Sequence, residues 1–525
     1  MAECERPIHD WLEQHAAARG EQPALVCGDE HLSWVALWDR VQAVARGLHA
    51  GGVGRRSRVA LFGENSIDYA VALLAVARLG AAVAPLPVGL GAAARRRAMR
   101  VAGCSAAIGD AAILRAVGED ATIAEDMHFA LDGAVFAGTA GASAVLPETV
   151  DCAAPYILTM TSGSTGAPKP IVFTQATKLR RAFLATRDVY GLGDDAVVLV
   201  STPMHHSLAQ RSALLPLLLG GTAVILPRFS PAAWLDAVRT HRVSFLFAVS
   251  SQLRVLLPDL RATTGGFPSL RTIVSSSARL DDATKEELVA ILGCDLHECY
   301  GTSEIGCATD FSLNDAPDKR SSVGRALPHV TLKICDQRHR ALPPGETGEI
   351  AVRTRTAFAG YLDDPAATAA AHDADGYFYT GDLGRLDADG WLYFRGRSKE
   401  VVITGGINVH PADVEAVIAS CPGVSECAVI GVDDAYFGEA ILAVVVGDRQ
   451  RGYTPAAVRR RCAEELAVYQ RPMAIEEIAA LPRNEMGKVH KPTLRERFRG
   501  YDATSRLRAL LLREVPGGSG KERAS

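Results

Sequence analysis

The chain has 525 residues, of which 48% are hydrophobic, so it is too long for one ordinary core and two or more domains are expected. Its formal net charge of −4 gives no electrostatic reason to expect nucleic-acid binding, because no long block of like charge occurs beyond short clusters such as residues 95–97. We therefore expect small molecules as its partners.

Its eleven cysteines include no C-x-x-C pair, which favours free thiols in a reducing compartment. The first residues, M-A-E-C-E-R-P, carry acidic side chains and lack an apolar core, so a signal peptide is not expected. Two apolar stretches, residues 69–90 and 213–226, are interrupted by prolines or are too short to span a bilayer. The composition predicts a cytoplasmic protein without a membrane span.

From about residue 23 to residue 390, short Val/Ile/Leu runs alternate with Ala-rich helical stretches, which is the pattern of an α/β fold. Residues 58–62 predict a buried strand, and a helix follows it through Leu79. Residues 245–249 and 272–274 predict further buried strands, each followed by small polar residues and a helix. Because ligands collect at the strand ends of open parallel sheets, we expect binding residues at these positions.

Residues 161–169, T-S-G-S-T-G-A-P-K, follow an apolar strand-like run. Glycines allow close backbone approach, hydroxyls add donors and the lysine supplies positive charge, so the segment favours phosphate binding. It differs from a P-loop, because Pro168 and Pro170 flank the lysine and proline blocks helix N–H donors. A surface turn has a similar composition and is the alternative. The candidate phosphate-binding residues are Thr161, Ser162, Gly163, Ser164, Thr165, Gly166 and Lys169.

Two segments further along carry candidate ligands. His205 and His206 do not favour a metal pair, because adjacent residues on a strand or helix point apart and no third ligand is evident. In residues 300–304, Y-G-T-S-E, the aromatic ring can cover a flat base, the hydroxyls can meet a phosphate, and the carboxylate can hold Mg²⁺.

The sequence pattern changes near residues 386–399, where a turn, a short strand and a charged connector are predicted. We place a domain boundary there. Residues 1–396 form the predicted large domain. Residues 397–500 form a compact α+β domain, with strands at 401–403, 427–432 and 440–446 and helices at 411–420 and near Ala457. Residues 501–525 form a basic tail that is helical at first and disordered from Pro516.

Two single residues in this region are ambiguous by themselves. Asp382, within T-G-D-L-G, has the setting of an ordinary turn aspartate. Lys488 follows Gly487 in a predicted exposed loop, where a lone lysine is normally a solvated charge.

Six segments resemble, in the family's order, the motifs of the adenylate-forming superfamily, which includes acyl- and aryl-CoA ligases, firefly luciferase and nonribosomal-peptide adenylation domains. They are residues 161–169, 203–206 (P-M-H-H), 300–304, 379–382 (Y-T-G-D), 396–399 (G-R-S-K) and 481–488 (L-P-R-N-E-M-G-K). The resemblance covers nearly the whole chain and is closest in motif to the acyl- and aryl-CoA ligases. It implies a large N-terminal α/β domain of layered sheets and helices and a smaller, mobile α+β C-terminal domain.

The resemblance implies a role for each matching residue. Residues 161–169 would hold the ATP phosphates, Tyr300 would lie against the adenine, and Thr302 would bind the α-phosphate. Gly301, between them, would also belong to the ATP-binding residues. Glu304 would serve the metal. Asp382 would accept hydrogen bonds from the ribose hydroxyls, a task that suits a carboxylate, with Arg397 assisting. Lys488 would reach the α-phosphate and the substrate carboxylate and stabilise charge there.

The remaining matches concern the acid and the second half-reaction. His206 would lie beside the acyl pocket, and Ser207 stands where amino-acid-activating relatives carry aspartate, which disfavours an amino-acid substrate. Lys399 matches the hinge about which the small domain rotates. The loop that lines the pantetheine tunnel matches Gly405, Gly406, Ile407 and Asn408, although a simple β-turn also explains that tetrapeptide. Departures from the family pattern occur at Pro170, Gln175 and residues 275–278.

The resemblance implies activation of a carboxylic acid by ATP and Mg²⁺ to an acyl-adenylate, followed by thioester formation with coenzyme A. The acid is expected to be apolar or aromatic, because residues 203–212 and 247–252 offer no clear counter-charge for a second ionic group. Two alternatives stay open: a stand-alone adenylating enzyme that loads a carrier protein, and a non-catalytic nucleotide-binding regulator. The presence of Glu304, Asp382, Lys399 and Lys488 argues against the regulator.

Overall fold

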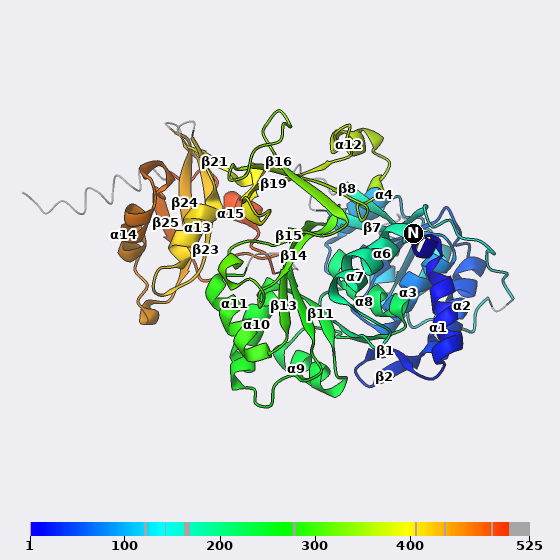
Figure 1. Cartoon of the computed structure of the whole chain (residues 1–525). Coiled ribbons are helices and arrows are strands. Elements are labelled where there is room, and N and C mark those ends of the chain that lie inside the picture. Colours follow the sequence, from blue (N-terminus) through cyan, green and yellow to red (C-terminus); the bar gives the residue numbers. More distant parts are fainter. Residues whose placement is uncertain are drawn as a thin grey trace, which may run out of the picture. The chain divides into compact units, whose positions relative to one another are not determined.

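The computed structural model describes residues 2–119, 123–141, 143–161, 169–276, 280–404, 407–434, 437–484 and 487–502 (Figure 1). The chain forms two compact units that interleave in sequence. Unit 1 comprises Met1–Lys333, Ala351–Thr380 and Gly390–Leu392, and unit 2 comprises Ile334–Ile350, Gly381–Asp389 and Tyr393–Ser525. Both units contain sheets and helices, which confirms the predicted α/β class.

The first sheet of unit 1 has nine strands in the order β15-β14-β13-β12-β11-β9-β10-β1-β2. The strands from β13 to β1 in this order pair in parallel, and β2, β14 and β15 join in antiparallel pairs. Their bounds are β1 (Pro23–Cys27), β2 (Glu30–Ser33), β9 (Val197–Val200), β10 (Thr222–Ile225), β11 (Phe245–Val249), β12 (Thr272–Ser276), β13 (Asp295–Thr302), β14 (Gly306–Ser312) and β15 (Arg325–Ala326). All five residues of β11 are buried, which explains the continuous apolar run in the sequence.

Four helices follow the parallel strands β9 to β12 of this sheet: α8 (Ser207–Leu219), α9 (Pro231–Thr240), α10 (Ser250–Ala262) and α11 (Asp282–Leu292). In Figure 1 α9, α10 and α11 lie together beside β11 and β13, in green. Trp234, Leu253 and Leu288 of these helices share one buried core with Leu246 and Ile273 of the sheet. The Asp281 carboxylate caps α11 by accepting a hydrogen bond from the Thr284 N–H.

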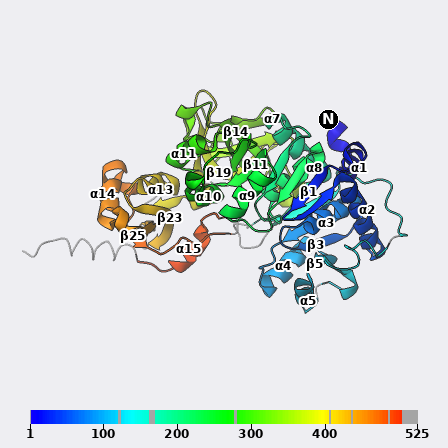
Figure 2. The same ribbon diagram turned by 90° about the horizontal axis from the view of Figure 1, so that it is seen from below.

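The second sheet of unit 1 has seven strands in the order β18-β8-β7-β4-β3-β5-β6. The strands from β7 to β6 pair in parallel, whereas β8 pairs antiparallel with both β7 and β18. Their bounds are β3 (Arg58–Phe62), β4 (Ala82–Leu86), β5 (Ala106–Gly109), β6 (His128–Ala130), β7 (Pro155–Thr161), β8 (Lys169–Thr174) and β18 (Gly360–Tyr361). Figure 2 shows α4 (Ala92–Ala102) and α5 (Ala111–Glu119) beside β3 and β5.

The remaining helices of unit 1 are α1 (Ile8–Arg19), α2 (Trp34–Ala50), α3 (Ile67–Arg78), α6 (Gln175–Ala182), α7 (Asp188–Tyr190) and α12 (Pro365–Ala370), with a π-helical turn η3 (Phe183–Arg187) after α6. Gln175, one of the departures from the family pattern, is buried at the start of α6. Its side chain accepts a hydrogen bond from Ile8 N and donates one to Ala77 O, each 2.9 Å long. This residue therefore joins α1, α3 and α6.

Unit 2 contains a sheet in the order β22-β21-β24-β23, with β25 paired in parallel to β24. The bounds are β21 (Val402–Thr404), β22 (Ile407–Val409), β23 (Val424–Asp434), β24 (Gly438–Gly447) and β25 (Ala474–Glu477), with helices α13 (Pro411–Ala419), α14 (Pro455–Glu465) and α15 (Lys491–Arg497). Val414 and Ile418 of α13 and Val458 of α14 share a core with Val429 and Ile441. These elements agree closely with the strands and helices predicted between residues 401 and 465.

A four-stranded sheet has the order β16 (Val330–Cys335), β17 (Gly348–Thr354), β19 (Phe378–Leu386) and β20 (Leu392–Arg397), and its residues belong partly to unit 1 and partly to unit 2. Within the ranges that the structure describes, no helix is long and apolar enough to cross a membrane. All eleven cysteines fall in these ranges; each is a free thiol, and each is buried or only partly exposed.

Candidate active site

The end of β13 and the turn to β14 contain four of the predicted site residues. Tyr300 is buried near the end of β13, and Thr302 accepts a hydrogen bond on Oγ1 from Ile305 N at 3.5 Å. A Cβ atom on Gly301 would lie 1.9 Å from the backbone oxygen of Gly306, so this close approach of two backbones admits no side chain. Gly301, which the sequence motif assigns to nucleotide binding, is therefore also needed for the close approach of these two backbones.

The three consecutive backbone carbonyls of residues 303–305 accept hydrogen bonds from other segments of unit 1. The Arg181 guanidinium of α6 donates from Nη2 to Ser303 O and to Glu304 O, both at 2.9 Å. Phe358 N donates to Glu304 O at 2.6 Å. The Thr356 hydroxyl donates to Ile305 O at 2.8 Å. The backbone around Glu304 is therefore fixed by four hydrogen bonds from three residues that the sequence motif does not include.

The Glu304 carboxylate meets Tyr361 of β18, in unit 1. Burial first, and then the charge of Glu304 and a hydrogen bond to it, raise the pKa of the Tyr361 phenol to about 12. The ammonium of Lys169, the first residue of β8, lies 5.6 Å from the centroid of the Tyr361 ring and 3.8 Å from Oδ2 of Asp364. Lys169 and Glu304, predicted from separate segments, are thus brought to one cluster, and Tyr361 and Asp364 are members that sequence reasoning missed.

Five residues of the predicted phosphate loop lie outside the described residues: Ser162, Gly163, Ser164, Thr165 and Gly166. At the ends of the loop, Thr161 of β7 pairs in register with Lys169 of β8. The two strands that flank the loop, β7 and β8, are therefore hydrogen-bonded neighbours.

The predicted acyl-pocket histidine stands at the start of α8. His206 occupies the N-cap position and Ser207 is the first helical residue. The His205 and His206 ring centroids are 4.2 Å apart, so the expectation that these side chains point apart is wrong. The reason is a turn, in which His206 N donates to Pro203 O, in place of a strand or helix. No group of three metal-ligating side chains occurs among the described residues.

Asn65, which follows β3, holds this segment and was not predicted from the sequence. It is 6% exposed, and its side chain donates to Thr202 O at 2.9 Å and accepts from Met204 N at 2.7 Å. A polar residue just after a buried strand was the available signal.

Arg211, five residues beyond His206, is a basic residue in the segment that was expected to offer no clear counter-charge. Its Nε donates to the Thr186 hydroxyl at 2.9 Å, and its guanidinium lies 4.5 Å from the centroid of the Phe247 ring. It also donates to Ala185 O. These contacts engage the guanidinium within unit 1.

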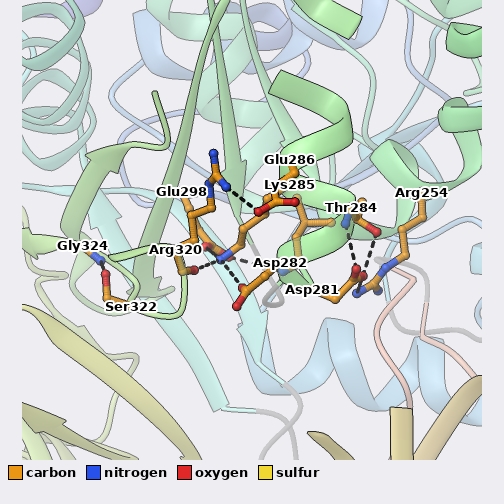
Figure 3. A network of polar contacts seen from close by, with 11 residues as sticks. Arg254, Asp281, Asp282, Thr284, Lys285, Glu286, Glu298, Arg320, Ser322 and Gly324 are labelled. Carbon is orange, nitrogen blue, oxygen red and sulfur yellow. Dashed lines mark hydrogen bonds and ion pairs between the residues drawn. The ribbon is translucent and has the colours of Figure 1, made fainter. Parts of the chain in front are cut away.

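Glu298 of β13, two residues before the motif at residues 300–304, forms a buried ion pair with Lys285. Glu298 shares a face of β13 with Tyr300 and Thr302, because side chains alternate along a strand. Figure 3 shows the Lys285 ammonium of α11 between the Glu298 carboxylate, the Asp282 carboxylate and the backbone oxygen of Arg320. Lys285 is 0% exposed and Glu298 2% exposed, and Glu298 also accepts from Leu280 N at 3.3 Å. The pair therefore fixes α11, β13 and the backbone at Leu280 together.

On the other face of β13, His297 is clamped by two carboxylates. Its ring nitrogens lie 2.7 Å from Asp310 Oδ2 and 2.8 Å from Asp295 Oδ2, and Tyr190 also donates to Asp310. Burial opposes the charged imidazole, but the hydrogen bonds and charges of Asp310 and Asp295 outweigh it and raise the pKa of His297 to about 9. His297 is therefore charged at neutral pH.

This geometry predicts a pH-dependent stability of unit 1. The folded-state pKa of His297 lies above its ordinary value of 6.5, so its contribution is complete below pH 6.5 and is lost as the pH rises through about 9. The loss amounts to at most about 3 kcal/mol. All five tryptophans belong to unit 1, so urea unfolding followed by tryptophan fluorescence reports this unit. Between pH 6 and 9.5 the free energy of unfolding is expected to fall more steeply in the wild type than in His297→Gln, and parallel profiles would contradict the assignment.

In unit 2, Asp382 and Arg397 form the pair that the motifs predict. Asp382 is 3% exposed, and its Oδ1 lies 3.1 Å from Nε of Arg397. Gly381, which precedes it, has a φ of +71° and donates its N–H to the Glu349 carboxylate at 2.8 Å. Glu349 was missed, because nothing in its local sequence separates it from a surface glutamate. The sequence alternative of an ordinary turn aspartate does not account for this burial.

Lys488 stands in the same unit between Gly487 and the bridge residue Val489. Desolvation by the surrounding chain is the largest effect on Lys488, and it lowers the pKa of the ammonium, as does the charge of Arg397. The charges of Asp382 and Glu400 act in the opposite direction. Its side chain is nevertheless exposed, so solvent screens part of each interaction. Lys488, Asp382 and Arg397 are thus within electrostatic reach of one another.

The remaining predicted residues flank the β21–β22 hairpin. Ile407 opens β22 and is 44% exposed, and it pairs in register with Thr404. Gly405 and Gly406, which connect the two strands, and the side chains of Lys399 and Asn408 lie outside the described part of the chain. Their predicted roles in the tunnel and the hinge stay predictions.

Two family models match the chain along most of its length. Residues 12–362 match the model described as AMP-binding enzyme, and residues 413–488 match the model described as AMP-binding enzyme C-terminal domain. The chain therefore belongs to the AMP-binding, adenylate-forming enzyme superfamily, and the predicted fold of a large N-terminal domain with a C-terminal domain is confirmed.

Relatives narrow the class further. The chain is 30% identical over 500 residues to the indoleacetate–CoA ligase of Aromatoleum aromaticum, covering 93% of this chain and 98% of the relative. It is 28% identical to the fatty acid–[acyl-carrier-protein] ligase ScoC of Streptomyces coeruleorubidus, with coverages of 93% and 96%. Among solved structures, ATP-bound MatB from Rhodopseudomonas palustris is similar with a TM-score of 0.86 at 29% identity, over 94% of this chain and 99% of that chain. The protein is an enzyme of the AMP-forming acid–CoA ligase family.

Proposed function

We propose that this enzyme activates an apolar or aromatic carboxylic acid with Mg·ATP and transfers the acyl group to coenzyme A, in the cytoplasm. The observation that carries the proposal is the cluster of Lys169, Tyr361 and Glu304, which gathers a cation and a carboxylate beside the predicted phosphate loop. An aromatic acid is supported by the similarity to an indoleacetate–CoA ligase along nearly the whole of both chains.

The reaction has two steps. A carboxylate oxygen of the acid attacks the α-phosphorus of ATP, the bond from that phosphorus to the bridging oxygen breaks, and pyrophosphate leaves. The thiolate of CoA then attacks the acyl carbon, the bond from that carbon to the AMP oxygen breaks, and AMP leaves. No protein nucleophile is required, so the enzyme contributes orientation and charge stabilisation.

Residues in both units are assigned to the first step. The loop at residues 161–169, with Lys169, holds the β- and γ-phosphates that depart. Tyr300, Gly301 and Thr302 hold the adenine side and the α-phosphate, and Asp382 with Arg397 holds the ribose hydroxyls, since a buried carboxylate is a strong acceptor for them. Lys488 stabilises negative charge on the α-phosphate and the attacking carboxylate.

The chemistry of Glu304 fits Mg²⁺. Mg²⁺ prefers oxygen ligands and is usually held by one or two carboxylates together with substrate phosphates and water. One carboxylate oriented by a phenol, with no group of three ligating side chains in the described ranges, suits that mode better than a preformed cage. When bound, the ion would neutralise charge on the phosphates.

The second step is assigned to residues 397–500. We propose residues 1–396 and 397–500 as the domains that move relative to each other, with Lys399 as the hinge and Gly405, Gly406, Ile407 and Asn408 lining the path of the thiol. His206 and Ser207 are assigned to the acyl pocket. The basic residues 501–525 are assigned no function.

The proposal is tested by carboxylate-dependent ATP–pyrophosphate exchange with a panel of apolar, aromatic and dicarboxylic acids. Exchange is expected with the apolar and aromatic acids and to depend on Mg²⁺. Exchange with dicarboxylic acids alone would overturn the choice of acid. ATP binding without exchange for any acid would instead indicate a nucleotide-binding regulator.

The acceptor is tested separately, because the similarity to ScoC favours a carrier protein as the second candidate. Purified enzyme is offered free CoA and a holo-carrier protein in parallel, and the thioester is detected by mass. A CoA thioester is expected; product with the carrier protein alone would assign the enzyme to the second candidate.

A further inference from the structure

Helix α6 directs two basic side chains into the protein. Lys178 is 4% exposed and Arg181 is 5% exposed, and they stand three residues apart, on the same side of the helix. Both side chains lie over the same ring: Nζ of Lys178 is 4.3 Å and the Arg181 guanidinium 4.4 Å from the centroid of Phe173. Burial first, and then the charges of Arg181 and Arg211, lower the pKa of Lys178 well below its usual range. Both side chains are therefore buried polar groups that need hydrogen-bond partners.

Arg181 reaches the turn after β13. Its Nη2 bonds Ser303 O and Glu304 O, and its Nε donates to Thr356 O at 2.9 Å. A planar guanidinium is suited to this, because it presents several donors in a fixed geometry that lysine cannot reproduce. Burial first, and then the charge of Arg211, lower the pKa of Arg181 to about 9, which leaves it charged at neutral pH.

Lys178 reaches a different segment. Its Nζ donates to the Gln210 side-chain oxygen at 2.9 Å, and the Gln210 amide donates to His205 O at 3.3 Å. Gln210 is 0% exposed and lies one turn inside α8, where its backbone N–H also bonds His206 O. The chain of contacts from Lys178 therefore ends at the histidine pair that precedes α8.

We propose that Lys178 and Arg181 are positioning residues with separate targets. Arg181 sets the backbone of Glu304 and with it the carboxylate that serves Mg·ATP. Lys178 sets the start of α8 through Gln210 and with it the residues assigned to the acid. This inference rests on the proposed function, because it uses the roles assigned there to Glu304 and His206.

The test compares Arg181→Met with Lys178→Met, two variants on one helix, of similar burial and over the same ring. In pyrophosphate exchange, Arg181→Met is expected to raise the KM for Mg·ATP about tenfold and to change the KM for the acid less than about twofold. Lys178→Met is expected to give the reverse split. Arg181→Lys is expected to behave like Arg181→Met, and Gln210→Leu like Lys178→Met, because each removes the same contact.

Two outcomes would overturn the inference: the same kinetic pattern in both methionine variants, or losses that follow only the folded fraction measured by tryptophan fluorescence. A binding measurement keeps the inference testable apart from turnover. By calorimetry, Arg181→Met is expected to weaken Mg²⁺-dependent ATP binding about tenfold, and Lys178→Met to leave it unchanged within about twofold. If the wild type exchanges with no acid, the proposed function fails, while equal ATP binding by the wild type and Arg181→Met would reject the positioning role.

Discussion

Lys488→Ala is expected to reduce carboxylate-dependent pyrophosphate exchange by about 10²–10³-fold, which corresponds to about 3–4 kcal/mol of transition-state stabilisation. The physical reason is that charge accumulates on the α-phosphate and the carboxylate as they join, and an ammonium group near Asp382 and Arg397 is assigned to that charge. Thioester formation from supplied acyl-AMP is expected to change less than about threefold, because the adenylate is already formed. Both half-reactions are measured on the same preparation.

The control is Arg460→Ala, which removes another cation of unit 2. Arg460 is exposed on α14, where its side chain is 76% exposed and faces Glu464 at 4.0 Å. Both half-reactions are expected to proceed at the wild-type rate in this variant. Equal losses of the two half-reactions in Lys488→Ala would contradict the role assigned to this lysine, since a general disturbance of unit 2 would affect both.

Lys285→Met is expected to lower the free energy of unfolding of unit 1 by about 3–5 kcal/mol. The substitution keeps most of the side-chain volume but leaves the Glu298 carboxylate in the interior without its ammonium partner. A buried charge without its counter-charge costs more than the ion pair contributes. Urea unfolding followed by tryptophan fluorescence measures the loss, since all five tryptophans lie in unit 1.

The double variant Lys285→Met/Glu298→Gln separates charge from packing. Removing both charges is expected to restore most of the stability lost in the single variant, because the amide keeps a hydrogen-bond acceptor for Leu280 N. If the double variant is as unstable as Lys285→Met, the loss comes from packing and the electrostatic explanation is wrong. Arg254→Met, at the exposed pair with Asp281, is the control and is expected to change stability by less than about 1 kcal/mol.

The buried strands were the easiest part of the fold to predict. β3 and β11 occur at the predicted bounds, because strands covered on both faces must be short continuous apolar runs. Strand order was beyond reach: β18 pairs with β8 although they lie far apart in the chain. Such pairings depend on long-range contacts that no local pattern encodes.

The candidate site residues show the same difference between local and long-range features. Residues that act through a local motif, such as Tyr300 and Glu304, could be proposed from the sequence. Residues that act from a distance could not: Arg181 reaches the same turn from more than a hundred residues away, and in the sequence it is one of several basic residues on a short helix. The departure at Gln175 had a similar origin, since its partners lie on α1 and α3.

All eleven cysteines are buried or only partly exposed, which suits this enzyme to labelling at introduced cysteines. Thiol reagents attack the thiolate, and burial raises the pKa of Cys104 and of Cys294 to about 12, so these two thiols are expected to react slowly. One cysteine introduced at an exposed position of each unit, for example Glu21→Cys and Arg460→Cys, would be labelled first by a maleimide dye. Energy transfer between the two dyes would then follow the units through both half-reactions without removal of any natural cysteine.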